Sequence, residues 1–96
     1  MEENYILLIY DVQDSKIRTQ IYETAKDYGL DSIQFSVFLG KLNRNMREEL
    51  FYKVSEKVKN QEANILLVPI GEKEFKKIKS TGSPLAISQK SFMSFV

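Results

Sequence analysis

The chain has 96 residues, 43% hydrophobic and 28% charged, with a net charge of +1, which suits one small globular domain and argues against intrinsic disorder. Neither cysteine nor histidine occurs, which excludes disulfides, cysteine–zinc sites, thiol nucleophiles and imidazole general bases. An enzyme of this composition is therefore expected to use a metal held by Asp or Glu oxygens.

The N-terminal part of the chain predicts a strand followed by a helix. Residues 4–11 form a continuous run rich in β-formers, typical of a central strand that is buried on both faces. Asp14 occupies a helix N-cap position, and Gly29 occupies the place of a left-handed C-terminal cap. Between them runs one apolar helical stripe, formed by Ile17, Ile21, Ala25 and Tyr28.

The middle of the chain predicts a strand, with a candidate break near residues 34–35, and then a second helix. The strand, residues 32–42, alternates between two faces. We interpret the face with Ile33, Phe35, Val37 and Leu39 as the core face. Gln34, Ser36 and Phe38 lie on the opposite face, where an exposed Phe38 indicates a recognition or subunit surface, with a position covered by the C-terminal tail as the alternative. Asn43 or Asn45 can cap the next helix, whose apolar stripe is Met46, Leu50, Val54 and Val58.

The last elements complete the predicted architecture. Residues 64–70 form a second continuous apolar strand, and Phe75 and Ile78 indicate a short helical turn. The element order predicts an α+β, ferredoxin-like βαββαβ sandwich over residues 1–80, with the helices on one face of a mainly antiparallel sheet. The apolar runs are strand-sized and the chain starts with acidic residues, so we expect no membrane contact and a cytoplasmic location.

Residues 81–96 form a C-terminal tail with its own apolar character, carried by Leu85, Ala86, Ile87, Phe92, Met93, Phe95 and Val96. Leaving these side chains in water is unfavourable, and a domain of this size gains from a partner chain. We therefore expect the tail to form a strand exchanged in a homodimer, with a tail packed on its own domain as the alternative.

The excess of positive charge is concentrated near the C-terminal end. Residues 1–72 carry nine basic and twelve acidic side chains, whereas residues 73–96 carry five lysines against one glutamate. This asymmetry permits a local polyanion-binding surface, formed by Lys73, Lys76, Lys77 and Lys79, and a solvated lysine-rich turn is the alternative.

The candidate site is the end of the first strand, where Asp11 follows five apolar residues. A carboxylate at the mouth of a sheet suits a hard cation such as Mg²⁺, or Mn²⁺, which can activate water toward a phosphodiester. Lys16 and Arg18 follow closely and can hold the phosphate. The alternatives are ordinary turn chemistry for Asp11 and solvent-facing positions for the two cations.

Four segments together carry a resemblance to a known family. They are Tyr10-Asp11-Val12-Gln13-Asp14, the helix bearing Lys16 and Arg18, Tyr28-Gly29-Leu30, and Gln34-Phe35-Ser36-Val37-Phe38. In this order and spacing, over about residues 5–80, the chain resembles the small CRISPR-associated protein of spacer acquisition, the Cas-two family.

The resemblance implies a ferredoxin-like homodimer that bridges duplex DNA in a complex with the CRISPR integrase. It also implies metal-dependent endonuclease activity on single-stranded RNA or duplex DNA in some members. On this basis Asp11 is the metal ligand, and Tyr10, Arg18, Ser36 and Phe38 are the further catalytic-site residues.

The chain departs from the family pattern at two positions, with Leu39 where an acidic residue is frequent and Ile17 between two cations that are often adjacent arginines. Two other functions stay open at this point. One is a stand-alone, toxin-like endoribonuclease resembling virulence-associated protein D, and the other is a non-catalytic ferredoxin-like binding module.

Overall fold

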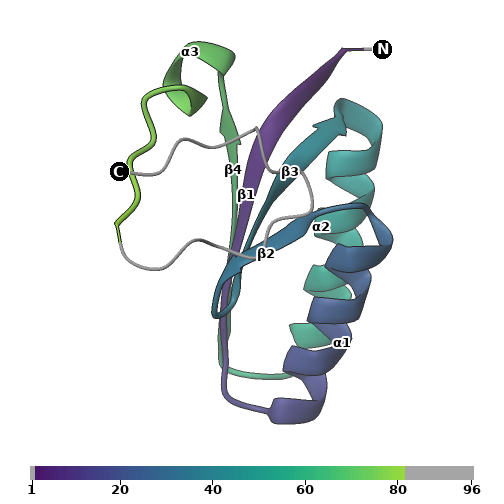
Figure 1. The fold of residues 1–96 in the computed structure, drawn as a ribbon. Helices are drawn as coiled ribbons and strands as arrows, with labels where there is room; N and C mark the ends of the chain where they lie inside the picture. The colour runs from purple at the N-terminus through teal and green to yellow at the C-terminus, as the bar shows by residue number, and fades with distance from the viewer. Residues whose placement is uncertain (1, 82–96) are drawn as a thin grey trace.

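The computed structural model describes residues 2–81, and the strand exchange expected of the tail therefore falls on residues outside the described part. The elements in chain order are β1 (Glu3–Val12), α1 (Ser15–Asp27), β2 (Asp31–Gln34), β3 (Val37–Asn43), α2 (Arg44–Val58), β4 (Ala63–Ile70) and α3 (Glu72–Phe75). Figure 1 shows α1 and α2 side by side on one face of the sheet.

The four strands form one sheet in the order β2-β3-β1-β4, and every neighbouring pair is antiparallel. This strand order, with both long helices on one face, confirms the predicted ferredoxin-like α+β fold. Within residues 2–81 no long helix covers the other face, called the open side below, although Ile78 and Ser80 lie beside it. β2 and β4 are the edge strands.

Local hydrogen bonds explain where the helices begin and end. The Asp14 carboxylate accepts the Ile17 N–H at 2.9 Å, and the Asn43 side chain accepts the Met46 N–H at 2.8 Å. Asn43, rather than Asn45, is thus the cap of α2. After α1, Gly29 has a φ of 82°, a left-handed conformation that glycine adopts without steric cost.

The strands alternate between a helix-facing side and an open side. On the helix-facing side Leu8 lies opposite Phe38, and both are fully buried among the core residues of α1 and α2. On the open side Ile9 is paired with Leu66, whose side chain is 58% exposed. β1 is therefore buried on its helix-facing side and only partly on its open side, where we had expected burial on both.

The faces predicted for residues 32–42 were wrong at two aromatic positions. Phe35 lies in the tight turn between β2 and β3 and is 82% exposed, whereas Phe38 is completely buried in the helix-facing core. The break near residues 34–35 is confirmed, and it removes Phe35 from the strand alternation. The helices cover the Phe38 side of β3, and Leu39 on the other side is fully buried as well, as predicted.

No helix between residues 2 and 81 combines the length and the apolar composition needed to cross a lipid bilayer.

Candidate functional site

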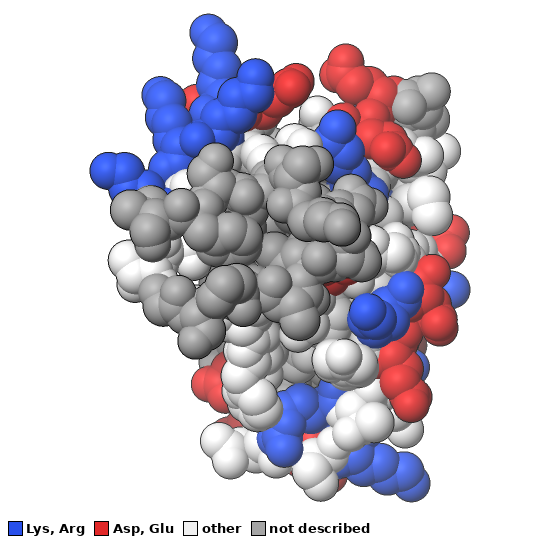
Figure 2. All heavy atoms as spheres, in the orientation of Figure 1, with Lys and Arg blue, Asp and Glu red and all other residues white. Residues whose placement is uncertain are grey.

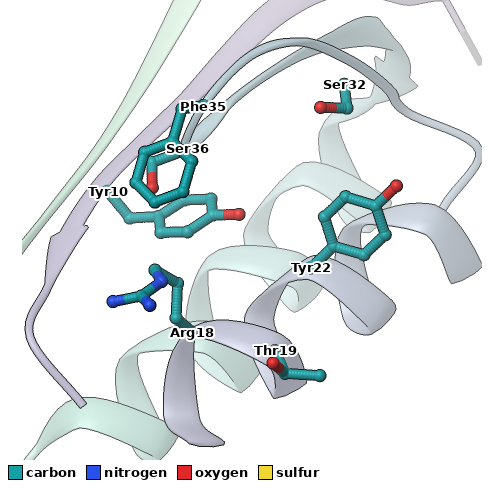
Figure 3. A pocket seen from close by; sticks show the side chains of 7 residues that line it. All are labelled: Tyr10, Arg18, Thr19, Tyr22, Ser32, Phe35 and Ser36. Carbon is teal, nitrogen blue, oxygen red and sulfur yellow. The ribbon is translucent and has the colours of Figure 1, made fainter. Parts of the chain in front are cut away.

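Three of the predicted site residues come together in one pocket on the helix-facing side. Tyr10 arrives from β1, Arg18 from α1 and Ser36 from the β2–β3 turn (Figure 3). The pocket has a volume of about 330 Å³, and its other lining residues are Thr19, Tyr22, Ser32 and Phe35. Because its walls are phenols, hydroxyls, one guanidinium and one phenyl ring, it offers hydrogen bonds, a positive charge and flat apolar surface.

Arg18 is held in place by backbone carbonyl groups at the end of β1. Its Nη1 donates to the carbonyl oxygens of Val12 at 3.0 Å and Gln13 at 3.3 Å. The guanidinium carbon also lies 5.5 Å from the centre of the Phe35 ring, a cation–π distance. These contacts fix the positive charge at the pocket wall.

The β2–β3 turn is tied to β1 beside the pocket. Ser36 has a φ of 61°, an uncommon conformation for a residue with a side chain, and its carbonyl oxygen accepts the Tyr10 N–H at 3.1 Å. Burial, with a smaller contribution from the nearby Tyr22 hydroxyl, raises the pKa of Tyr10, although the Arg18 charge acts in the opposite direction. Tyr10 therefore stays protonated at neutral pH.

Phe38 supports this pocket from behind. Its ring packs edge-on against Tyr22 at a centroid distance of 5.2 Å and lies 6.3 Å from the Tyr10 ring. Since Phe38 is fully buried, its place in the fold is that of a packing residue that positions the two tyrosines.

Asp11, the predicted metal ligand, lies apart from this pocket. Successive side chains of a strand point to opposite faces, so Asp11 is on the open side while Tyr10 is on the helix-facing side. The exposed Asp11 lines a polar depression of about 370 Å³ together with Gln13, Glu62, Ala63 and Asn64. Asp11 and Asn64 are direct cross-strand partners in the β1–β4 pair.

The donor set around Asp11 suits a hard cation chemically. Two carboxylates and two amide oxygens surround the depression, and Mg²⁺ typically takes one or two protein carboxylates and retains several waters. Within residues 2–81, no group of three acidic side chains gathers around a common point. One copy of the described chain thus offers a partial, oxygen-only coordination shell.

The predicted nucleic-acid contacts fall into two groups at opposite ends of the sheet. Lys16 and Arg18 lie at the start of α1, beside the end of β1. The exposed lysines of the other group lie in and just after α3, where Figure 2 shows basic side chains gathered at the upper left: Lys73, Lys76, Lys77 and Lys79. The stacked rings of Phe75 and Tyr5 place α3 beside the start of β1, and from there to Asp11 is about 20 Å along the strand.

Sequence reasoning missed several residues at the two sites, Thr19 and Ser32 among them. Phe35 was assigned to the core, and Tyr22, Glu62 and Asn64 carried no functional prediction. For Phe35, the candidate break near residues 34–35 could have identified it as a turn residue, because a residue in a turn does not follow the alternation of the strand. For Asn64 and Glu62 only the β1–β4 register reveals their closeness to Asp11.

Together these features define a small ferredoxin-like α+β protein with oxygen, guanidinium and aromatic groups clustered near one end of its sheet. The sequence profile of the CRISPR associated protein Cas2 family matches residues 4–78. The chain therefore belongs to this family, which confirms the resemblance seen in the sequence.

Individual relatives agree with this assignment. A protein of Desulforudis audaxviator named CRISPR-associated endoribonuclease Cas2 is 37% identical over 73% of this chain and 66% of its own length, just under two thirds. A Chloroflexus aurantiacus protein named CRISPR-associated endoribonuclease Cas2 2 is 38% identical over 64% of this chain and 72% of its own. A Thermoproteus tenax relative, 25% identical over 72% of this chain and 26% of its own length, is named a CRISPR-associated endonuclease Cas1/endonuclease Cas2 fusion.

Solved structures support the fold. The crystal structure of a protein described as cas2 has a TM-score of 0.66 and 25% identity, over 74% of this chain and 79% of that one. The structure of a hypothetical protein from Thermus thermophilus has a TM-score of 0.67 at 21% identity, over 73% and 84% of the two chains.

Proposed function

We propose that this protein acts in CRISPR adaptation, as a homodimer that bridges duplex DNA within a complex containing the CRISPR integrase and that carries a metal-dependent endonuclease site at Asp11. The observation that carries the proposal is the family match over residues 4–78, which includes Asp11 at the solvent-exposed end of β1. The fusion of a Cas2 relative to a Cas1 endonuclease in one polypeptide supports the integrase as partner.

The metal site consists of Asp11 with support from its neighbours. Asp11 would hold Mg²⁺ or Mn²⁺, with Asn64 and Gln13 offering amide oxygens and Glu62 a second carboxylate at the same depression. When bound, the cation supplies Lewis-acid stabilisation of the negative charge that develops on a phosphodiester. Arg18 reaches the end of β1 from the helix-facing side. A nucleic-acid strand that passes around this end would therefore meet both the Asp11 carboxylate and the Arg18 guanidinium.

Duplex DNA would contact the two basic groups through its phosphates. The α3 lysines lie beside the start of β1 on the open side, and the Lys16–Arg18 pair lies beside its end on the helix-facing side. The two ends of the strand are about 20 Å apart, so the two groups would contact different parts of an extended polyanion rather than one small ligand. Because each neutralised phosphate releases counterions, DNA affinity should fall steeply as salt rises.

The second copy in the homodimer would contact the open side of the sheet. Leu66 is 58% and Val68 is 38% exposed there, and in the described part of the chain β4 pairs with β1 alone. An exposed apolar strand at a sheet edge is a surface that another chain can extend or cover.

A nuclease assay with matched aspartate variants tests the site. Labelled single-stranded RNA and duplex DNA are incubated with Mg²⁺ and the wild type, Asp11→Asn or Asp14→Asn. Asp14→Asn removes the same charge but keeps an N-cap residue, so it should cleave as the wild type does. We expect Asp11→Asn to lose cleavage by about a hundredfold or more; cleavage at the wild-type rate would overturn the assignment of Asp11.

Co-purification with the integrase, followed by an integration assay, tests the assembly. Integration that depends on this protein supports the bridge. If neither the wild type nor Asp11→Asn cleaves, but integration persists in Asp11→Asn, the protein acts as a non-catalytic bridge. Since the curated relatives are named endoribonucleases, RNA cleavage by a protein that neither co-purifies with the integrase nor supports integration would favour a stand-alone ribonuclease.

A further inference from the structure

We propose that the pocket between β1, α1 and the β2–β3 turn binds one unpaired nucleobase of a single-stranded nucleic acid, with the Phe35 ring as its stacking platform. The inference rests on the proposed function, since it takes nucleic acid to be the ligand. It assigns to this face a contact with a base, in addition to the contacts with phosphates described above.

Phe35 is displayed in a way that packing does not explain. Its side chain is 82% exposed, although a phenyl ring is among the side chains that gain most from burial. The turn that carries it is anchored, because the Ser36 carbonyl oxygen accepts the Tyr10 N–H. Arg18 lies over the ring at 5.5 Å, so the ring is held in position while a large area stays available for stacking.

The other walls of the pocket suit a base rather than a purely apolar ligand. Figure 3 shows the Phe35 and Tyr10 rings on one side and Tyr22 on the other. Hydroxyl groups of Tyr22, Ser32 and Ser36 also line the pocket, and hydroxyls can donate and accept, which matches the mixed edges of all bases. None of the seven lining residues is acidic, so a polyanion can approach without repulsion from the pocket itself.

Arg18 can neutralise the phosphate adjoining the base. Its hydrogen bonds to Val12 and Gln13 both use Nη1, and within residues 2–81 Nε and Nη2 have no hydrogen-bond partner. These N–H groups are available for a phosphate oxygen, for which the planar guanidinium is well suited.

The size and shape of the pocket favour an unpaired base. A volume of about 330 Å³ is at the lower end of pockets that hold small ligands, so it suits one base rather than a base pair. Bases in a duplex are stacked and reach a protein only by their edges, whereas the bases of a single strand can stack on an exposed aromatic ring.

Binding of single strands with and without bases tests the proposal. Fluorescence anisotropy is measured in EDTA, which prevents metal-dependent cleavage, with oligothymidylate, oligouridylate and an abasic strand of the same length, about a dozen nucleotides each. The proteins are the wild type, Phe35→Ala, Phe35→Trp and Tyr52→Ala. Tyr52 is the matched control, because it is an exposed aromatic residue, 66% exposed, on α2.

We expect Phe35→Ala to weaken binding of the base-containing strands about tenfold, within the range for loss of one stacked base. Phe35→Trp and Tyr52→Ala should bind as the wild type does, and the abasic strand should bind wild type and Phe35→Ala equally. A larger loss for oligouridylate than for oligothymidylate would identify RNA as the preferred source of the base, and the reverse would identify DNA.

Two results would overturn the proposal. One is unchanged affinity of Phe35→Ala for both base-containing strands, and the other is an equal loss for the abasic strand. If duplex binding and Asp11-dependent cleavage persist in either case, the pocket proposal fails alone. If the wild type binds neither duplex nor single strands at low salt, the proposed function fails and the pocket proposal fails with it.

Discussion

The two sides of the sheet differ in how completely they are covered. On the helix-facing side Ile6, Leu8 and Phe38 have no exposed surface, because α1 and α2 pack their apolar stripes against them. On the open side Leu66 and Val68 remain substantially exposed. The helix-facing side is therefore fully covered at these positions, whereas on the open side Leu39 is fully buried too and, among the described residues, the exposed large apolar side chains are those of Leu66 and Val68 on β4.

The same difference separates two neighbouring candidate residues. Tyr10 and Asp11 are adjacent in the chain, yet Tyr10 belongs to the aromatic pocket and Asp11 to the polar depression on the opposite side. A ligand that contacts both must pass around the end of β1. Residues of one short motif can therefore serve two distinct surfaces when the motif lies on a strand.

The largest expected effect is the difference in stability loss between a Leu→Ala substitution on the helix-facing side of the sheet and one on the open side. Leu8→Ala should lower the free energy of unfolding by about 3 kcal/mol, because it leaves a cavity in the helix-facing core. Leu66→Ala should cost less than about 1 kcal/mol, because that side chain is already exposed. Urea denaturation measures both. Equal losses of unfolding free energy in the two variants, independent of protein concentration, would contradict the expected difference between the two sides. A loss that depends on protein concentration in Leu66→Ala alone would identify a subunit contact.

Gly40→Ala probes how tightly the helix-facing side is packed. A Cβ at Gly40 would lie 2.6 Å from Leu30 Cδ2 and 3.2 Å from Leu30 Cα, and Leu30 is itself buried. We expect a loss of about 2 kcal/mol from overpacking. Lys41→Ala, one residue further along β3 and exposed, is the control and should cost less than about 1 kcal/mol. A Gly40→Ala protein as stable as the wild type in thermal unfolding would show that Leu30 can move aside.

The two aspartates near the end of β1 should separate stability from activity. Asp14→Ala removes the cap hydrogen bond to Ile17 and should cost about 1 kcal/mol. Asp11→Ala, on the exposed strand end, should change stability by less than about 0.5 kcal/mol while abolishing metal-dependent cleavage. Thermal unfolding and the nuclease assay on the same samples measure both, and a destabilised Asp11→Ala would assign this carboxylate a structural role.

The smallest effect is expected on the outer surface of the helix layer. The Tyr28 hydroxyl donates to the Glu49 carboxylate, and this bond is the main cause that lowers the pKa of Glu49. A lowered carboxylate pKa stabilises the folded state above the unfolded-state pKa, and the contribution is lost as pH falls through the folded-state pKa.

Tyr28→Phe should therefore raise the Glu49 pKa toward its ordinary value, as followed by NMR titration. The Lys53 ammonium, 3.6 Å away, would keep part of the lowering. An unchanged Glu49 pKa in Tyr28→Phe would show that the hydrogen bond does not form in solution.

Much of the local structure could be predicted because its causes are local. Asp14 caps α1, Asn43 caps α2 and Gly29 ends the first helix in a left-handed conformation. The two apolar runs form the strands β1 and β4. Each of these features depends on side chains within a few residues of one another, which a sequence displays directly.

The candidate site was predictable only in part. Tyr10, Arg18 and Ser36 do meet in one pocket, but Phe38 is buried behind it and the exposed ring is Phe35. Alternation predicts that two faces exist; it does not identify the face that packs against the helices when both carry apolar residues, as in β3, where Phe38 and Leu39 are both fully buried. The place of the turn and the docking of the helices made that choice.

The sequence by itself determined the order and ends of the elements, the ferredoxin-like class and the family, because periodicity, caps and motif spacing are properties of short segments. Only the tertiary structure decided which side of β3 packs against the helices, that Asp11 and Tyr10 face opposite surfaces, and that Glu62 and Asn64 lie beside Asp11. The physical reason is that these relations depend on strand register and on the layer that excludes water, and both arise from contacts between residues distant in the chain.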